Sequence, residues 1–319
     1  MRFFNKGLYL VDNDLREEPI ARVINLAQQN QSEIVMLDIF PEPRIDSSAA
    51  ALLGGKQQVI DQICKGRQDK ILEIVRRHDG DPKTTVQSRP GRRYLDAIKT
   101  VITGGYDMVL KMADNPPWSG QVLASDDLHL LRKCPCPVYL MHPNTSASDG
   151  PVIAAIDLNT DDYDEDLAAL NERLLEMASA AAAFGETELH VVHAWQSGVA
   201  GFVSIWADMP AQAEQAAYDG EHRRRQDALS AAMQTLRKQL DDNTNSVIKP
   251  RGRLLNGPPE SVIPEQAQKL NASTVVMGTV ARTGIPGLIM GNTAEDILHQ
   301  LRCDVVALKP EGFVCPVKP

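Results

Sequence analysis

The stretch GTVARTGIPGLIMGNTAEDIL, from Gly278 to Leu298, is the part of the sequence from which the fold is most readily inferred. The apolar run ASTVVM precedes it, and a segment with helical spacing and acidic residues in its first turn, Glu295 and Asp296, follows it. This pattern predicts a strand, a glycine-rich loop and the start of a helix. Glycines let a backbone approach a ligand closely, and N–H groups at a helix start attract phosphate. A turn that binds nothing fits the same pattern, and neither GxxxxGK[ST] nor GxGxxG occurs in the chain.

The composition describes a chain of 319 residues, which is long enough for two domains. Hydrophobic residues make up 43% and charged residues 24%, as in soluble globular proteins. The net charge is −9, so no basic surface for nucleic acid or for an anionic membrane is expected. We interpret the local run Arg223 to Arg225 as the solvated face of a helix.

The N-terminus, MRFFNKGLYLVDND, has too short an apolar run for a signal peptide, and no apolar stretch is long enough to span a membrane. We therefore expect a cytoplasmic protein without a membrane partner. The five cysteines do not suggest a disulfide framework. Cys134 and Cys136 form a CPC triplet, which we interpret as free thiols at a strand entry in preference to the start of a zinc site.

Strands and helices are expected to alternate through the first half of the chain. The expected strands are Leu8 to Val11, Glu33 to Phe40, Thr84 to Gln87, Asp107 to Met112 and Pro137 to Met141. The expected helices are Arg16 to Gln31, Ala49 to Arg77, Arg92 to Thr103 and Ser125 to Lys133.

The polar segment 143–150 is a predicted linker, so we expect domains at 1–142 and 151–319. The same alternation returns after the linker. Strands are expected at Pro151 to Asp157, Glu188 to Trp195, Ser246 to Lys249, the run before Gly278, and Asp304 to Lys309. Helices are expected at Tyr163 to Phe184, Pro210 to Leu240, Glu260 to Leu270 and after the glycine-rich stretch.

The two halves have the spacing of an internal repeat. Asp12 and Asp157 end the first strands and lie 145 residues apart, whereas 167 residues separate Cys136 from Cys303 before the last strands. The second copy has therefore gained 22 residues (167 − 145). A repeat of this length predicts two copies of one α/β domain, each a parallel sheet with helices on both faces. Ligands of such sheets bind beyond the carboxyl ends of the strands, so Asp157 and the Gly278 loop should face one crevice.

These residues resemble the universal stress protein superfamily. Its nucleotide-binding members carry GxxGx₉G[ST] after the fourth strand, and here Gly278, Ala281, Gly291 and Asn292 occupy those four positions. HLLRKCPCPV in the first half and GTVxRTGI in the second are similar to tandem two-domain members, and the resemblance covers essentially the whole chain. It implies two tandem domains, each a five-stranded parallel sheet in the order 3-2-1-4-5.

The resemblance also implies a site for ATP or a related adenine nucleotide, with Mg²⁺, in the second domain. Asp157 would lie near the adenine and ribose and could hold the metal ion, and Val191 or Val192 would lie beside the base. Arg282 could reach a phosphate. The cradle for ribose and phosphates would consist of Met277, Gly278, Gly291, Asn292 and Thr293.

Two residues depart from the family pattern. Ala281 replaces a glycine. Alanine costs energy at a position where φ is positive, which favours a different bend of the loop. Asn292 replaces a hydroxyl residue, and an asparagine can still cap a helix and donate to an anion.

The offset of 167 residues relates this cradle to Lys111, Asp114, Ala124 and Ser125 in the first half. Every glycine is lost there, and Asp114 would repel a phosphate. We expect no nucleotide in the first domain and suggest Lys111 as a partner for Asp12.

Three functions follow as alternatives. The first is a regulatory stress-response protein that binds adenine nucleotide in its second domain. The second is a slow ATP-hydrolysing enzyme, for which no general base is evident near the loop, since His193 is expected only to close its strand. The third is a ligand-free interaction module whose halves form an internal pseudo-dimer through Val138 to Met141 and Val305 to Leu308, with a homodimer as a further possibility.

Overall fold

The structure is a computed structural model that describes residues 2–44, 54–78, 83–113, 125–143, 150–158, 164–197, 211–279 and 290–318. Strands and helices alternate in the first half. They are β1 (Lys6–Leu10), α1 (Glu17–Asn30), β2 (Glu33–Phe40), α3 (Lys56–His78), β3 (Thr84–Pro90), α4 (Arg93–Gly104), β4 (Met108–Met112), α5 (Ser125–Lys133) and β5 (Val138–Met141).

Among the described residues, the second half repeats this alternation with one additional short helix, α9. Its elements are β6 (Val152–Ala155), α6 (Glu165–Phe184), β7 (Leu189–Trp195), α8 (Ala211–Gln239), α9 (Asp242–Ile248), β8 (Arg251–Asn256), α10 (Pro259–Leu270), β9 (Thr274–Gly278), α11 (Asn292–Gln300) and β10 (Asp304–Leu308). The additional helix lies between the first and fourth strands of the second half, where the longer repeat spacing requires extra residues.

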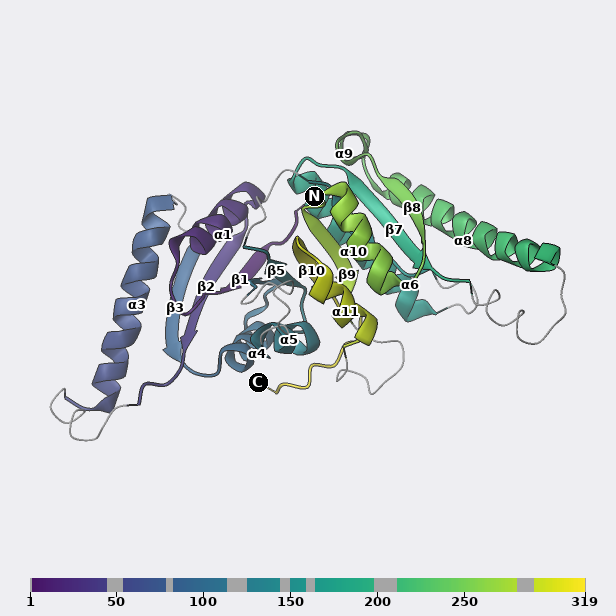
Figure 1. Ribbon diagram of the computed structural model, residues 1–319. Coiled ribbons are helices and arrows are strands. Elements are labelled where there is room, and N and C mark those ends of the chain that lie inside the picture. The colour runs from purple at the N-terminus through teal and green to yellow at the C-terminus, as the bar shows by residue number, and fades with distance from the viewer. Residues whose placement is uncertain are drawn as a thin grey trace.

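The strands form one ten-stranded sheet in the order β3-β2-β1-β4-β5-β10-β9-β6-β7-β8. Within each half the order corresponds to 3-2-1-4-5 and all pairings are parallel. The two halves meet at β5 and β10, which pair antiparallel with Val306 opposite Tyr139. Figure 1 shows the halves side by side, with α3 and α8 at the two far ends of the molecule.

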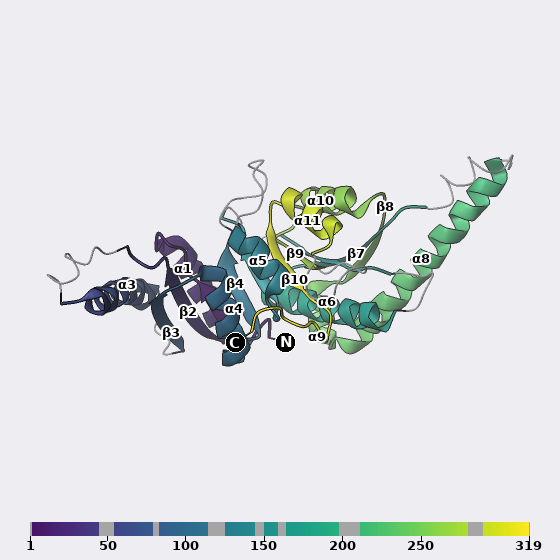
Figure 2. The ribbon, with the colours of Figure 1, turned by 90° about the horizontal axis from the view of Figure 1, so that it is seen from below.

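Helices cover both faces of the sheet, as the apolar strands require. One core cluster joins strand side chains to α1, α3, α6 and α8, and the other joins them to α4, α5, α10 and α11. Each cluster contains residues of both halves, so each side of the core is continuous across the β5–β10 junction. In the second half, Figure 2 shows α10 and α11 on one side of β7 and β9, with α6 and α9 on the other.

The prediction of a strand at Ser246 to Lys249 is wrong. These residues belong to the end of α9 and its left-handed C-cap, Lys249, and the third strand of this half is β8. Asp241 begins the helix by accepting a hydrogen bond from the Thr244 N–H at 2.9 Å. A capped helix with one buried apolar residue, Ile248, therefore replaced the strand that the short run Val247 and Ile248 suggested.

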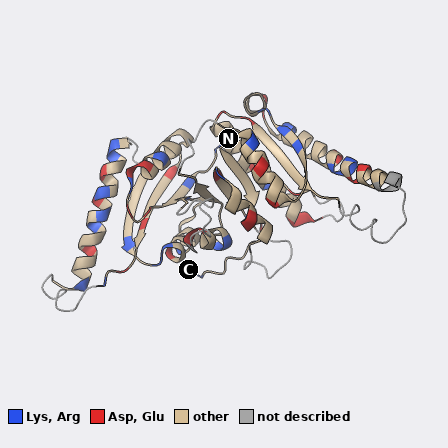
Figure 3. Ribbon diagram, viewed as in Figure 1, with Lys and Arg blue, Asp and Glu red and all other residues tan. Residues whose placement is uncertain are grey.

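Charged side chains are mixed on the helices, as Figure 3 shows along α3 and α8. In the run Arg223 to Arg225, the first two residues are exposed, as expected. Arg225 instead packs its guanidinium over the Trp195 ring, 5.1 Å from the ring centroid. None of the helices within the described ranges combines the length and the apolar character needed to cross a membrane.

Candidate functional site

A cavity of about 640 Å³ lies at the carboxyl ends of β6 and β9, between α6 on one side and α10 and α11 on the other. It brings together six residues that the sequence placed at a nucleotide site, although they come from three separate segments of the chain. These residues are Asp157, Met277, Gly278, Gly291, Asn292 and Thr293. The cavity therefore lies where an open parallel sheet is expected to bind its ligand.

Small residues keep the strand ends of this cavity open. Ala155 and Gly278 are the last residues of β6 and β9, Ala194 is the residue before the last in the neighbouring β7, and all three line the cavity. A Cβ atom at Gly278 would lie 3.1 Å from Leu170 Cδ2, so any larger residue there would displace Leu170 or occupy the cavity. The absence of a side chain at Gly278 thus creates space for a ligand beside the backbone.

Asp157 follows β6, and the side chain of Asn171 on α6 holds its backbone. The Asp157 N–H donates to Asn171 Oδ1 at 3.1 Å, and Asn171 Nδ2 donates to the Asp157 carbonyl at 2.7 Å. This paired contact fixes the direction in which the chain leaves the sheet. It also places a half-buried carboxylate at the wall of the cavity.

His193 supports the same segment from β7. The Leu158 N–H donates to His193 Nδ1 at 3.2 Å, and the same ring nitrogen lies 3.3 Å from the Ile156 carbonyl. Burial lowers the pKa of His193, which opposes its protonation near neutral pH. His193 does not line the cavity, and its contacts are those of a residue that positions the chain on both sides of Asp157.

The N-terminus of α11 borders the cavity opposite Asp157. Gly291 is the N-cap, and its N–H donates to the Thr279 carbonyl at 3.1 Å, which ties the helix start to the end of β9. The N–H groups of Asn292, Thr293 and Ala294 have no acceptor within the helix, because they belong to its first turn. Asn292 begins the helix instead of capping it. The positive end of the helix dipole and these N–H groups can accommodate an anion.

Val191 and Val192 lie in the core and do not line the cavity. They point to opposite faces of β7, where both are fully buried. Ala194, two residues beyond Val192 on the same strand, lines the cavity. Arg282 and Ala281 lie outside the described residues.

Side chains of α6, α10 and α11 complete the walls together with Met290, and the sequence did not identify them as site residues. For the wall residues on α6, the only indication in the sequence is the helical spacing of the apolar side chains, which is equally typical of core packing. Only the fold shows that the end of this apolar stripe extends past the sheet edge. These additional wall residues are Leu167, Leu170, Asn171, Leu174, Pro259, Ile263, Met290 and Ile297.

The equivalent place in the first half is filled by a buried ion pair. Lys111 and Asp127 correspond to Gly278 and Ala294 through the offset of 167 residues. Both side chains are fully buried, and Lys111 Nζ lies 2.8 Å from Asp127 Oδ1. Asp12, which we had suggested as a partner of Lys111, forms an ion pair with Arg16 at 3.2 Å. A long side chain and its counter-charge thus occupy the position that glycine keeps open in the second half.

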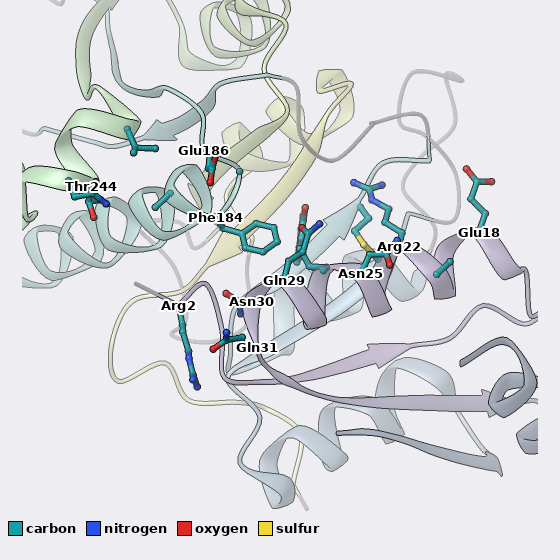
Figure 4. A pocket seen from close by; sticks show the side chains of 18 residues that line it. Arg2, Glu18, Arg22, Asn25, Gln29, Asn30, Gln31, Phe184, Glu186 and Thr244 are labelled. Atoms are coloured by element: carbon teal, nitrogen blue, oxygen red, sulfur yellow. The ribbon is translucent and has the colours of Figure 1, made fainter. Parts of the chain in front are cut away.

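A larger cavity, of about 1110 Å³, lies between the two halves (Figure 4). Figure 4 shows Phe184 and Glu186 of the second half on the side facing Asn25 and Gln29 of α1. The C-terminal ends of α1 and α6 both border this cavity, and helix C-termini carry partial negative charge. Arg2 and Arg22 also line this cavity, but it includes none of the residues predicted for the nucleotide, so the smaller cavity at Gly278 is the better candidate.

The fold defines an α/β protein of two repeated halves, and the second half carries a cavity at its strand ends. The model of the universal stress protein family matches residues 164–309. Universal stress protein E of Escherichia coli K12 is 34% identical over 229 residues, which are 71% of this chain and 68% of that protein. The chain belongs to the universal stress protein family.

Similarity to other members extends over the whole chain. The universal stress protein E homolog of Haemophilus influenzae is 24% identical over 326 residues, which cover 97% of this chain and 98% of that protein. Among solved structures, the functionally unknown protein PA1789 from Pseudomonas aeruginosa PAO1 has a TM-score of 0.66 at 26% identity and covers 97% of this chain and 94% of its own. These matches include both halves and therefore agree with the tandem arrangement.

Proposed function

We propose that this protein is a cytoplasmic stress-response regulator whose second half binds ATP or a related adenine nucleotide. The observation that carries the proposal is the single cavity in which Asp157, the open edge at Gly278 and the start of α11 converge. Apolar walls from Leu170, Leu174 and other side chains suit a flat base, and the first-turn N–H groups suit phosphate. The names of the relatives support a role in the response to stress.

A bound nucleotide would use the residues of the cavity in distinct ways. Its phosphates would lie against Gly291, Asn292 and Thr293 at the positive end of α11, with Arg282 as a further candidate contact. Its base would lie between the apolar side chains of α6 and α10. Asp157 is the carboxylate that would hold a phosphate-bound Mg²⁺, because carboxylate oxygen is a ligand that this ion prefers.

We propose binding without rapid hydrolysis. Hydrolysis needs a group that positions or activates water near the terminal phosphate. His193 lies outside the cavity and contacts backbone groups, which supports a positioning role and not a catalytic one. The first half, with Lys111 and Asp127 in place of the cradle, is proposed to bind no nucleotide in this manner.

Mass spectrometry of the purified, denatured protein tests the proposal. We expect adenine nucleotide to be released from the wild type and from Gly220→Asp, and to be absent from Gly278→Asp. Gly220 lies on α8 with open space around its Cα, so Gly220→Asp adds the same charge away from the cavity. If the wild type releases no nucleotide and millimolar ATP with Mg²⁺ does not raise its melting temperature, the ligand-free module is the better description.

A further inference from the structure

Three cysteines and a lysine gather where the two halves of the sheet meet. Cys134 and Cys136 lie between α5 and β5, and Lys309 follows β10 directly. Cys315 belongs to the C-terminal segment, which folds back so that its Sγ donates to the Lys133 carbonyl at 3.1 Å. Side chains from both halves of the chain thus form one cluster, which the proposed nucleotide site does not include.

Two of the thiols are adjacent but differ in their access to solvent. Cys134 Sγ and Cys136 Sγ are 3.6 Å apart, which is hydrogen-bonding distance for sulfur. Cys134 is fully buried, whereas Cys136 is half-buried and lines a surface cavity of about 490 Å³ together with Cys315. A small molecule in this cavity would meet Cys136 first, with Cys134 directly behind it.

Lys309 supplies a positive charge to these thiols. Only 3% of the residue is exposed, and in the described part of the chain its Nζ has no hydrogen-bond partner and no carboxylate. Burial lowers the pKa of Lys309, and the three thiols oppose that shift because their thiolates would stabilise the ammonium ion. The hydrogen bond between the two thiols lowers the pKa of Cys134 and raises the pKa of Cys136, so the pair holds one thiolate and one shared proton.

We propose that Cys134 and Cys136 are a redox-active dithiol that reduces hydrogen peroxide, with Lys309 as the positioning cation. The pair shares one proton, which passes from Cys136 to Cys134 so that the sulfur of Cys136 can attack a peroxide oxygen. The O–O bond breaks, and the departing hydroxide takes that proton from Cys134 to become water. Cys136 is then a sulfenic acid. The Cys134 thiolate attacks Cys136 Sγ, an S–S bond forms, and hydroxide leaves as a second water. Two thiols and one peroxide give one disulfide and two waters, with both electrons supplied by the thiols.

Cys64 provides the matched comparison within the chain. It is half-buried on α3, as Cys136 is half-buried before β5, but burial and the carboxylates of Asp61 and Asp38 raise its pKa. It has partial access to solvent without a neighbouring thiol contact. If solvent exposure alone determined the rate of oxidation, Cys64 would be oxidised as readily as Cys136. The proposed dithiol predicts faster oxidation of Cys136.

Disulfide mapping of the full-length wild-type chain tests this proposal. The reduced protein is treated with one equivalent of hydrogen peroxide, alkylated and digested with trypsin. Since Lys133 precedes Cys134, both cysteines lie on one tryptic peptide. We expect this peptide to be lighter by two hydrogens and unalkylated, while Cys64 remains alkylated. A disulfide from Cys136 to Cys315, or oxidation of Cys64 at the same rate, would overturn the assignment.

Two variants test the order of the steps and the role of the lysine. Cys134→Ala should accumulate a sulfenic acid on Cys136 that dimedone traps, because the resolving thiol is gone. Lys309→Met should slow peptide oxidation about tenfold at pH 7, the change expected for a thiolate population lowered by one pKa unit, while Cys64→Ser should leave the rate unchanged. No trapped adduct in Cys134→Ala, or an unchanged rate in a folded Lys309→Met, would contradict the mechanism. The disulfide mapping of the wild-type chain tests the proposal even if these variants do not fold.

Discussion

Asp304 joins the two halves through a buried network of polar contacts. Its buried carboxylate accepts hydrogen bonds from the Tyr139 hydroxyl at 2.6 Å and the His142 N–H at 2.8 Å, and it forms an ion pair with Arg22. Burial raises the pKa of Asp304, and the Arg22 cation opposes that shift. A carboxylate without these partners would be costly to bury at this position.

Replacing Asp304 with asparagine should destabilise the protein. Asp304→Asn removes the negative charge but leaves the Arg22 cation against the junction, so we expect the free energy of unfolding to fall by about 3 kcal/mol. Urea denaturation measures this change. Asp227→Asn, at an exposed position of α8, is the control and should have an effect within about 0.5 kcal/mol. Equal stability of the two variants would show that the network contributes little.

His142 makes stability dependent on pH at the same junction. Burial, together with the nearby Arg22 cation, lowers the pKa of His142 to about 4. Because an unfolded histidine titrates near pH 6.5, the unfolded chain binds more protons between these values, and the free energy of unfolding should fall as the pH drops from about 6.5 to about 4.

Urea denaturation at pH 7 and pH 4.5 tests this titration. The loss of stability between the two pH values should be smaller in His142→Gln than in the wild type, because glutamine takes up no proton. His222→Gln, at an exposed site on α8, should keep the wild-type loss. Identical losses in the wild type and His142→Gln would exclude His142 as a source of the pH dependence.

At the scale of elements, packing at the first strand of the second half depends on a glycine. Gly150 lies before β6, and its carbonyl accepts hydrogen bonds from Thr187 Oγ1 and Ser273 Oγ. A Cβ atom there would lie 2.2 Å from the Asn271 carbonyl oxygen and 2.7 Å from the Ser273 nitrogen. Both are backbone atoms, which cannot move aside as a flexible side chain can.

Gly150→Ala should therefore destabilise the protein by about 2 kcal/mol or more. Gly66→Ala is the opposite case, since Gly66 is exposed on α3 with nothing near its Cα, and alanine there should stabilise the helix by about 0.5–1 kcal/mol. Thermal melts of the two variants measure both effects. A Gly150→Ala protein as stable as the wild type would contradict the close approach of the Gly150 segment to the chain before β9.

Most elements could be predicted from the sequence, because apolar strands and amphipathic helices follow local periodicity. β2 and α5 begin and end at the predicted residues. β8 was missed because its sequence, RGRLLN, contains charged residues and a glycine with few apolar residues. It lies at the edge of the sheet and pairs with β7 alone, so it needs fewer apolar side chains than a central strand. The apolar pair Val247 and Ile248 instead suggested a strand, but these residues form the end of a helix that Asp241 caps.

The candidate site was predictable only where its residues follow strand ends. Asp157 and Gly278 could be assigned to one edge from strand order alone. Asn171 could not, because its contact with Asp157 joins a helix face to a loop across the tertiary fold. Ala194 was missed for a related reason, since an alanine in an apolar strand carries no signal that distinguishes a cavity wall from the core.

At the scale of the whole molecule, the two repeated halves carry different side chains at one topological position. Gly278 leaves the position open in the second half, whereas Lys111 and Asp127 fill it in the first. The continuous sheet through β5 and β10 holds the two together. We propose that this arrangement gives one nucleotide per chain, with the first half serving as the partner that a separate subunit would otherwise supply.

Isothermal titration of the purified chain with ATP and Mg²⁺ tests this claim most directly. We expect one site per chain in the wild type and in Gly220→Asp, and affinity at least about tenfold weaker in Gly278→Asp, a loss of about 1.4 kcal/mol in binding free energy. A stoichiometry of two per chain would show that the first half also binds. Either no heat of binding or an affinity unchanged by Gly278→Asp would contradict the assignment of the nucleotide to the cavity at β6 and β9.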